Sequence, residues 1–374
     1  MNNKKLIFVA NTAWSMFNFR HGLLTKLINS GCRVIVIAPP DSYSKNLFNI
    51  GCEVIDLIAY TKEANPIIDI KMMWTLYRTY NQIKPDLIIH YTIKPNIYGS
   101  IAARLAGIPS LAITTGLGYA FINDNYVAKI ARLLYKLAFY FPNEVWFLND
   151  DDRQEFLKRN LIKESKASLL NGEGIDLDHF SPVSVSKKYN DKNVCFLMIA
   201  RMIWDKGVGE YVDAARSIKK KYPNVSFRIL GDCDFSNPRA INQEYLLKWD
   251  GERVIDYMGS VFDVRHVIAK SDCVVLPSYR EGIPRALLEA AAMAKPLIAT
   301  NVPGCRDVII DGRTGVLCQP KDVESLASAF ELIINSSIVE RYNMGKAGRA
   351  FMFERFDERL IIKKYFEVLN KYMS

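Results

Sequence analysis

The stretch Ser278-Tyr-Arg-Glu-Gly-Ile-Pro-Arg-Ala-Leu-Leu-Glu289 follows directly after the apolar run Cys273-Val-Val-Leu276. The apolar run is typical of a buried β-strand, and Pro277 ends it because proline has no N–H to give to a sheet. Pro284 suits the first turn of a helix, where its missing N–H would be unpaired in any case, and strong helix formers follow it. The stretch therefore predicts a strand, a tight loop and a helix that begins near Pro284.

The start of that helix is a candidate anion site. First-turn N–H groups lack partners within the helix, and together with the helix dipole they attract phosphate. Gly282 lets a ligand approach the backbone closely. Two carboxylates, Glu281 on the loop and Glu289 in the helix, flank this position and suit hydroxyl groups better than phosphates. Amides for a diphosphate beside carboxylates for sugar hydroxyls indicate a nucleotide-sugar site.

The motif Glu281-Gly-x-Pro-x-x-x-x-Glu289 resembles the Glu-x7-Glu motif of retaining glycosyltransferases of family 4, which have the GT-B fold. The resemblance implies an α/β protein with two Rossmann-like parallel-sheet domains that face each other across a cleft. It also implies a UDP-sugar donor, whose transferred sugar meets Glu281 and whose ribose meets Glu289. A strand, a turn and a helix with a solvated Glu289 is the alternative interpretation of the same residues.

The length of 374 residues is long for a single core and suits two domains. Hydrophobic residues make up 49% of the chain and charged residues 24%, a balance typical of globular proteins. The apolar stretch that ends at Ala10 is too short for a signal peptide, and no run approaches the length of a membrane span. The 7 cysteines are scattered singly, which favours reduced thiols in the cytosol over disulfides or a zinc site.

The net charge of +9 is unevenly distributed, because residues 1–140 carry 15 basic and 7 acidic side chains. A basic first half suggests a phosphate-bearing substrate or an acidic membrane surface as partner. Nucleic acid is not expected, since no zinc-finger, RRM or KH signature occurs. The absence of a Gly-x-Gly-x-x-Gly or Walker loop argues against a nicotinamide or P-loop enzyme.

Short β-branched runs alternate with amphipathic segments in both halves, a pattern typical of parallel α/β sheets. The expected strands are 6–10, 34–38, 54–58, 87–90, 111–114, 145–148 and 168–170, then 194–199, 225–230, 254–258, 274–276 and 297–300. The expected helices are 17–29, 67–83, 97–106, 126–141 and one from Asp150, then 207–220, 240–249, 263–270, one from near Pro284, 322–335, 338–348 and 358–373.

A change in composition between Leu170 and Asn193 marks the best candidate linker. The expected domains are an acceptor-binding domain at 1–175 and a nucleotide-sugar-binding domain at 191–356, joined by a linker at 176–190. The last segment, 357–374, contains a helix with one apolar face. Its family counterpart packs back on the first domain.

Arg201 and Lys206 follow the first strand of the second half, at the carboxyl edge where open α/β sheets bind ligands. They resemble the family's Arg and Lys pair that holds the leaving diphosphate. The resemblance implies that Arg201, Lys206 and Glu281 are the catalytic residues. The alternative is that Arg201 and Lys206 are surface charges that cap a helix. The resemblance also predicts the donor-binding residues Gly282, Ile283, Pro284, Arg285, Leu287, Glu289, Gly231 and Val261.

No metal and no other cofactor is expected. Three Asp-x-Asp pairs, at Asp150, Asp176 and Asp232, mimic the metal motif of the other large glycosyltransferase fold. We interpret them as turn or cap residues, because arginine, lysine and helix amides already supply the charge compensation that a metal would give.

Segments of the first half, at 18–20, 90–99 and 115–118, resemble one bacterial branch that builds surface polysaccharides and glycan precursors. This resemblance implies a lipid-linked saccharide acceptor, with undecaprenyl diphosphate as the expected carrier. Relatives often have histidine where this chain has Ile93, and His90 either replaces it or only closes a strand. The implied acceptor-side residues are Asn18, Arg20, His90, Lys94, Asn96 and Gly116.

The expected helix at 126–141 carries Lys129, Arg132 and Lys136 on one face, beside a broad apolar face with aromatics. This arrangement suits docking on an anionic membrane, so we expect a cytoplasmic protein held peripherally at the inner membrane. A helix packed on the core with a wet basic edge is the alternative.

Together these features predict a retaining, metal-independent hexosyltransferase. No nucleophile is evident near the motif, so the resemblance implies a front-face displacement in which the departing diphosphate takes the acceptor proton. Arg285 beside the donor would favour a hexuronic acid, with N-acetylhexosamine close behind, unless it points to solvent or pairs with Asp307. The rival functions are a nucleotide-sugar epimerase, a phosphorylase, and a non-catalytic protein that binds sugar nucleotides or anionic lipids.

Overall fold

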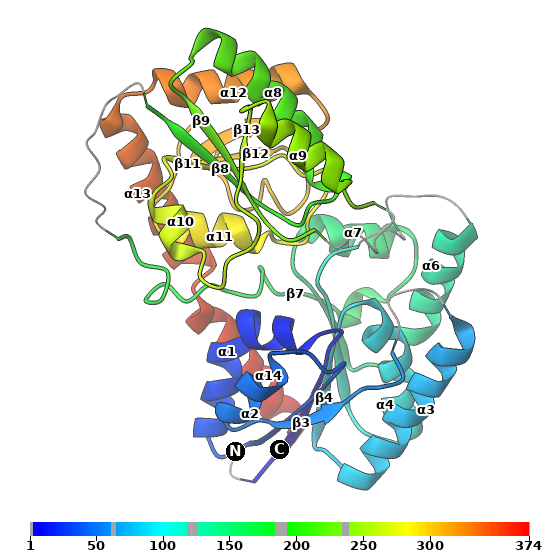
Figure 1. Cartoon of the computed structure of the whole chain (residues 1–374). Coiled ribbons are helices and arrows are strands. Elements are labelled where there is room, and N and C mark those ends of the chain that lie inside the picture. The colour runs from blue at the N-terminus through cyan, green and yellow to red at the C-terminus, as the bar shows by residue number, and fades with distance from the viewer. Residues whose placement is uncertain are drawn as a thin grey trace. The chain divides into compact units, whose positions relative to one another are not determined.

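The structure is a computed structural model that describes residues 3–60, 65–117, 121, 126–183, 193–233 and 239–373. The chain divides into two compact units (Figure 1). The first contains Met1–Gly174 together with Glu358–Ser374, and the second contains Ile175–Asp357. The last helix of the chain is thus part of the first unit.

The first unit is built on a parallel sheet with the strand order β3-β2-β1-β4-β5-β6-β7. The strands are β1 (Lys5–Val9), β2 (Arg33–Ala38), β3 (Glu53–Asp56), β4 (Leu87–Tyr91), β5 (Ser110–Thr114), β6 (Glu144–Phe147) and β7 (Ala167–Leu169). The helices are α1 (Ala13–Asn29), α2 (Ser44–Asn49), α3 (Pro66–Ile83), α4 (Ser100–Leu105), α6 (Tyr126–Ala138), α7 (Asp150–Lys158) and α14 (Glu358–Met373), with a π-helix η1 (Pro95–Gly99) and a 3-10 turn η2 (Glu164–Lys166).

Local sequence signals explain where these helices begin. The Thr12 hydroxyl accepts the Ser15 N–H at 3.1 Å and starts α1. Asn65 caps α3 in the same way, and Pro66 fills the first helical position. Helices cover both faces of the sheet, so the central strands β1, β4 and β5 are buried along almost their whole length and are mostly apolar. The order of the strands reverses between β1 and β4, and this is where open α/β sheets bind ligands.

Helix α14 packs against α1 and the sheet of the first unit. The Tyr365 hydroxyl on α14 is hydrogen-bonded to the Tyr91 hydroxyl at 2.7 Å, and its ring lies edge-on to Trp146 with centroids 5.0 Å apart. Lys371 forms an ion pair with Glu144 at 2.8 Å. The expected return of the C-terminal helix to the first domain is confirmed.

The second unit has a parallel sheet with the order β10-β9-β8-β11-β12-β13. Its strands are β8 (Cys195–Ile199), β9 (Ser226–Leu230), β10 (Asp256–Tyr257), β11 (Cys273–Leu276), β12 (Leu297–Thr300) and β13 (Gly315–Cys318). Its helices are α8 (Val208–Lys221), α9 (Gln243–Gly251), α10 (Arg265–Ala269), α11 (Arg285–Ala292), α12 (Val323–Asn335) and α13 (Ile338–Arg355), with a 3-10 turn η3 (Trp204–Lys206).

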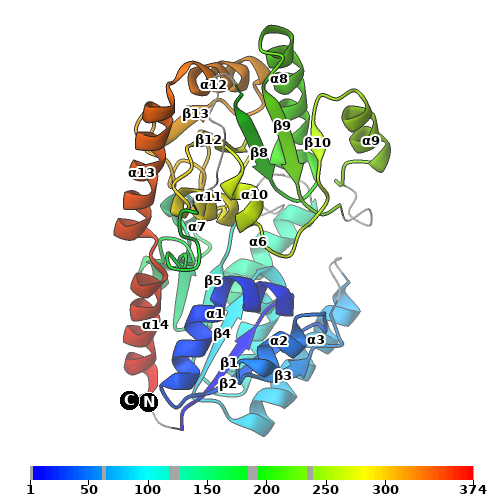
Figure 2. The same ribbon diagram turned by 60° about the vertical axis from the view of Figure 1, so that its left-hand side comes forward.

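Two apolar clusters sandwich this second sheet. Residues of α8, α9 and α12 form the cluster on one face, and residues of α10, α11 and α13 form the cluster on the other. Figure 2 shows α8 and α12 beside each other above strands β8 and β9. The order reverses between β8 and β11, so the loops that leave these two strands begin side by side.

The expected fold class, two Rossmann-like parallel-sheet domains, is confirmed, with corrections in detail. Helix α2 and strand β13 were not expected, and the helix expected at 97–106 is a π-helix followed by α4. The stretch expected to be a linker begins inside the second unit, where Arg349 donates to the carbonyls of Leu177 and Phe180, both at 2.9 Å. Residues 184–192 lie outside the described part.

Candidate active site

The loops after β8 and β11 touch each other at the switch point of the second sheet. The Tyr279 N–H donates to the Asp205 carbonyl at 3.0 Å. Gly207 ends η3 at a φ of +73°, and a Cβ there would lie 2.1 Å from the Pro277 carbonyl oxygen. Glycine is therefore required for this close approach, which brings Lys206 next to the second loop.

Lys206 and Glu281 form an ion pair across these two loops. The Ser278 hydroxyl donates to the same Glu281 Oε1 at 2.7 Å. The side chains of Lys206 and Glu281 are only 17% and 12% exposed. A catalytic cation and carboxylate predicted from segments far apart in the sequence therefore meet in a largely desolvated position at the sheet edge.

Helix α11 begins one residue later than the sequence predicts. Pro284 has extended backbone angles, φ −75° and ψ 116°, and is the residue before the helix, which starts at Arg285. The Pro284 carbonyl accepts the N–H of Leu287 at 3.1 Å, and the Leu287 side chain is buried in the apolar core. Leu287 thus fixes the helix, while the helix N-terminus points toward the loop that carries Glu281, Gly282 and Ile283.

The carboxylate of Glu289 pairs with Arg285 one helical turn earlier, at 3.1 Å. The Arg285 guanidinium also lies over the Phe180 ring, 5.8 Å from its centroid. Burial raises the pKa of Glu289, and the charge of Arg285 opposes this rise. We expected Arg285 to face the donor, solvent or Asp307, and its pairing with Glu289 is a contact that the sequence did not predict.

Two further glycines allow close backbone approaches at this edge. Gly231 donates to the Gly259 carbonyl at 2.7 Å, and a Cβ on Gly231 would lie 1.7 Å from the Ala200 carbonyl oxygen. Gly304 was missed by the sequence analysis: its φ is +82°, and a Cβ there would lie 2.3 Å from the Gly282 carbonyl oxygen. The Pro303-Gly304 pair directly after β12 was a turn signal that could have identified it.

Arg201 and Val261 are exposed at the same edge of the sheet. Among the described residues, the Arg201 side chain has no hydrogen-bond or ion-pair partner. It therefore remains a candidate ligand for a diphosphate. Within the described ranges, no group of histidine, cysteine, aspartate or glutamate side chains is arranged as metal ligands. Asp176 accepts two N–H groups of its own turn at 2.9 Å, as expected of a turn residue, and Asp234 lies outside the described part.

The predicted acceptor-side residues of the first unit differ in accessibility. Arg20 is buried, pairs with Glu173, and stacks 3.8 Å from the centroid of the Tyr91 ring. Lys94 forms a largely buried ion pair with Asp69 at 2.6 Å. Asn18 and Gly116 are half-buried, at the start of α1 and after β5. Gly118, in the same predicted loop as Gly116, lies outside the described residues.

His90 and Asn96 are corrections to the predicted acceptor set. His90 lies in β4 with no exposed surface, and its Nε2 is hydrogen-bonded to the Tyr80 hydroxyl at 3.0 Å. Burial lowers the pKa of His90 to about 3, so the imidazole is neutral. Asn96 is equally buried and donates to the Ile113 carbonyl at 2.9 Å. Of the two alternatives for His90, its burial favours the strand-closing one.

Two family models match the chain, one in each half. The model "Glycosyl transferase 4-like" matches residues 5–149, and "Glycosyl transferases group 1" matches residues 183–351. Arg201, Lys206, Glu281 and Glu289 all fall within the second match. The chain is a family 4 glycosyltransferase.

Curated relatives match this glycosyltransferase over most of its length. The chain is 29% identical, over 97% of itself and 98% of the relative, to N,N'-diacetylbacillosaminyl-diphospho-undecaprenol alpha-1,3-N-acetylgalactosaminyltransferase of Campylobacter jejuni. It is 27% identical, over 73% of itself and 72% of the relative, to UDP-Gal:alpha-D-GlcNAc-diphosphoundecaprenol alpha-1,3-galactosyltransferase of Escherichia coli. It is 23% identical, over 100% of itself and 99% of the relative, to the capsular polysaccharide biosynthesis glycosyltransferase CapM of Staphylococcus aureus.

Solved structures show the same fold. The sucrose-phosphate synthase of Thermosynechococcus elongatus superposes with a TM-score of 0.83 at 18% identity, covering 99% of both chains. Anabaena Alr3699/HepE in complex with UDP-glucose superposes with a TM-score of 0.80 at 18% identity, covering 98% of this chain and 99% of the other. The glycosyltransferase therefore has the GT-B fold.

Proposed function

We propose that this glycosyltransferase moves a sugar from a UDP-sugar to a hydroxyl of a lipid-linked saccharide, with retention of the anomeric configuration, in the synthesis of a bacterial surface glycan. The ion pair between Lys206 and Glu281 beside the N-terminus of α11 carries this proposal. The names of the Campylobacter and Escherichia relatives, both of which act on diphospho-undecaprenol saccharides, support the acceptor class.

The donor half of the proposal follows from the charges at the switch point. A diphosphate bound at the N-terminus of α11 would meet the helix dipole, the ammonium of Lys206 and the exposed guanidinium of Arg201. Lys206 would then exchange Glu281 for a phosphate oxygen, and Glu281 would turn to the hydroxyls of the transferred sugar. The ion pair with Lys206 and the hydrogen bond from Ser278 hold the Glu281 carboxylate in place.

The reaction proposed for this site is a front-face displacement. The bond between the anomeric carbon and the diphosphate oxygen breaks as the acceptor oxygen bonds to the same face of that carbon. The departing diphosphate accepts the proton of the acceptor hydroxyl. Cations and helix amides that stabilise the developing negative charge supply the main catalytic effect, and a metal ion is not required for it.

For the donor sugar we propose an N-acetylhexosamine ahead of a hexuronic acid. An unpaired Arg285 beside the donor would favour a carboxylate on the sugar. Glu289 already offsets the charge of Arg285 within the protein, which weakens the case for a hexuronic acid. The N-acetylgalactosaminyltransferase among the relatives points in the same direction.

For the location we propose peripheral docking of α6 on the anionic cytoplasmic face of the membrane. No described helix is long and apolar enough to cross a bilayer. The apolar residues Ile130, Leu133 and Leu137 of α6 are each more than half exposed, at 59%, 57% and 56%. Helix α6 packs Ala128, Tyr135 and Ala138 against the core of the first unit. Its other side exposes the apolar residues together with Lys129 and Lys136, a combination that suits docking at a membrane interface.

The test is a panel of UDP-sugars against undecaprenyl-diphosphate-linked and short-chain lipid-linked saccharides, with the products identified by mass spectrometry. The reactions are run in EDTA, because the proposed charge compensation needs no metal. We expect one added sugar on a lipid-linked acceptor. Epimerisation or phosphorolysis of a sugar substrate without an acceptor product, or binding without turnover on the full panel, would assign the protein to one of the rival functions.

A further inference from the structure

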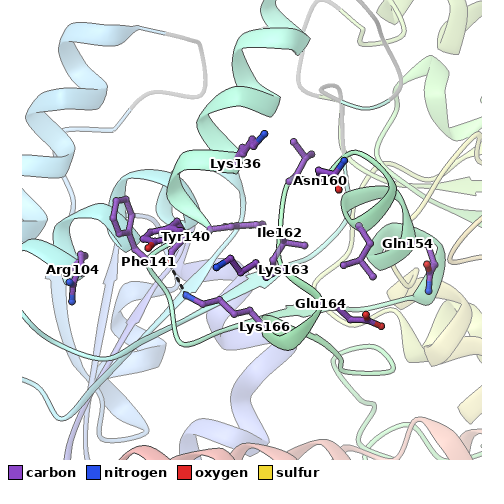
Figure 3. A pocket seen from close by; sticks show the side chains of 13 residues that line it. Arg104, Lys136, Tyr140, Phe141, Gln154, Asn160, Ile162, Lys163, Glu164 and Lys166 are labelled. Atoms are coloured by element: carbon purple, nitrogen blue, oxygen red, sulfur yellow. Dashed lines mark hydrogen bonds between the residues drawn. The ribbon is translucent and has the colours of Figure 1, made fainter.

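The first unit contains a pocket of about 1000 Å³ between the ends of α4, α6 and α7 and the segment before β7 (Figure 3). Each of these segments directly precedes a strand of the parallel sheet, so the pocket lies at the amino edge of the β5–β6–β7 part. The predicted acceptor residues follow strands and lie at the carboxyl edge. Within the first unit, the pocket is therefore at the opposite edge of the sheet from the predicted acceptor residues.

The polar lining of the pocket is strongly cationic. Four basic side chains and a single carboxylate contribute to it: Arg104, Lys136, Lys163, Lys166 and Glu164. Among the described residues, Arg104, Lys136 and Lys163 form no ion pair. Four cations with a single carboxylate among them repel one another, and a bound anion would reduce this repulsion.

Lys166 is the fixed member of this group. Its Nζ donates to the carbonyl of Tyr140 at 2.6 Å (Figure 3) and to that of Pro142 at 2.8 Å, which leaves one of its three N–H bonds for a ligand. Partial burial lowers the pKa of Lys166, and the charges of Lys163 and Arg104 lower it further. The ammonium groups of Lys163 and Lys166 lie 5.8 and 5.7 Å from the centroid of the same Tyr140 ring, and Arg104 lines the other end of the pocket (Figure 3).

Apart from Gln154 and Asn160, the rest of the lining is apolar or aromatic, and it continues onto the side of α6 that is proposed to face the membrane. Phe139, Phe141, Leu157, Leu161 and Ile162 line the pocket together with Tyr140. Tyr140 is 66% exposed and follows the exposed Ile130, Leu133 and Leu137 at helical spacing. An inorganic anion needs no such apolar rim, whereas an amphiphile with an anionic head does.

We propose that this pocket binds the phosphate headgroup of an anionic phospholipid, with the acyl chains directed along Tyr140 and Leu137. Arg104, Lys163 and Lys166 bind the phosphate. Lys136 belongs both to the pocket lining and to α6, the helix that is proposed to dock on the membrane. The proposal rests on the proposed docking of α6 and is independent of the donor chemistry in the second unit. It adds recognition of a single lipid molecule to a general attraction for negative surfaces.

The test compares two charge-matched double variants on vesicles. Arg104→Glu/Lys163→Glu reverses two pocket cations, and Lys45→Glu/Lys158→Glu reverses two exposed lysines outside the pocket. Co-sedimentation is measured on vesicles of phosphatidylcholine alone and mixed with phosphatidylglycerol. We expect the pocket variant to lose at least about tenfold in affinity for the mixed vesicles, and the control to lose only a few fold. An equal loss in both variants would overturn the proposal in favour of diffuse surface charge.

Further measurements separate the loss of a lipid site from misfolding, from binding of a soluble anion and from loss of transferase activity. Lys163→Gln removes charge without reversing it, and it should show a smaller loss in the same direction with an unchanged thermal unfolding curve. Inorganic phosphate is titrated into the wild type by calorimetry, and binding as tight as that of the vesicles would overturn the proposal in favour of a site for a soluble anion. Transfer to a short-chain acceptor without membranes should be unchanged in the pocket variant, so a failed lipid site and a failed transferase give different results.

Discussion

The ammonium of Lys206 and the carboxylate of Glu281 form an ion pair although they lie 75 residues apart in the chain. The pair joins the exits of β8 and β11, the two strands at which the order of the second sheet reverses. The Ser278 hydroxyl donates a hydrogen bond to the Glu281 carboxylate, and the backbone of Gly304 passes close to the backbone of Glu281. Contacts within the protein thus fix the relative positions of Lys206 and Glu281.

Substitution of Glu281 and of Glu289 should affect different kinetic constants. Glu281→Ala should lower kcat by about 100-fold, because it removes a contact to the reacting sugar and leaves Lys206 without its partner. Glu289→Ala should raise the donor KM by about tenfold with a smaller effect on kcat, as expected for the loss of one charged hydrogen bond to the ribose. Steady-state kinetics on both variants, with Glu331→Ala on the surface of α12 as control, would separate the two roles. Near-wild-type constants for both would remove the motif from the site.

The pH dependence of donor binding should depend on Arg285. Burial raises the pKa of Glu289 and Arg285 opposes the rise, so Arg285→Ala should raise this pKa further. If Glu289 accepts a hydrogen bond from the ribose, as the sequence predicts, it does so best as the ionised carboxylate, and donor affinity should fall as the pH falls through the pKa of Glu289. That loss should begin at a higher pH in Arg285→Ala, and Arg285→Lys should restore part of the difference. Calorimetric titration of the UDP-sugar across the acid range measures this, and superimposable profiles for all three proteins would show that Glu289 does not meet the donor.

The close contact between the two loops predicts a stability effect at Gly207. Alanine there would have to adopt a φ of +73° and place its Cβ 2.1 Å from the Pro277 carbonyl oxygen. We expect Gly207→Ala to lower the free energy of unfolding by about 2 kcal/mol or more. Gly251→Ala, whose Cβ would have no neighbour within 4 Å, should be neutral or stabilising by up to about 1 kcal/mol. Denaturant unfolding measures the free energy of unfolding of both variants. Equal values for Gly207→Ala and Gly251→Ala would mean that Gly207 does not lie against Pro277.

Membrane docking through α6 should combine charge and apolar contact. Lys129, Arg132 and Lys136 changed together to Glu should weaken binding to anionic vesicles, and added salt should weaken the wild type in the same way. Leu133→Ser/Leu137→Ser should weaken binding at all salt concentrations, because it removes the apolar face. Leu332→Ser, at an equally exposed position on α12, is the control. If vesicle binding is the same in all of these variants and at all salt concentrations, α6 does not dock on the membrane.

Periodic apolar patterns predicted most of the fold. Strands such as β1 and β11 are buried on both faces and appear in the sequence as short, continuous apolar runs. Strand β13 was missed because it is four residues long and begins with Gly315, where a Cβ would lie 2.4 Å from the Leu297 carbonyl oxygen. The helix at α2 has a single buried residue, Leu47, so it carries no periodic signal.

The proximity of residues at the strand ends was easier to predict than their accessibility. Lys206 and Glu281 were expected at one edge of the sheet because both follow strands of that sheet, and they lie together there. The two alternatives for His90 stayed open because a strand-terminal histidine looks the same in sequence whether it faces a ligand or, as here, packs against Tyr80 and Gly99. The pairing of Arg285 with Glu289 was not expected, because Glu289 was considered only as a ligand of the ribose. Burial and pairing depend on the tertiary structure, which local sequence does not encode.

We propose that a nucleotide-sugar donor binds where the loops after β8 and β11 meet. A crystal structure of the enzyme with UDP would show this binding site. We expect diphosphate oxygens at the N-terminus of α11 within hydrogen-bonding distance of Arg201 and Lys206, with the Lys206–Glu281 pair opened. A diphosphate bound elsewhere, such as in the basic pocket of the first unit, with Lys206 still paired to Glu281, would contradict it.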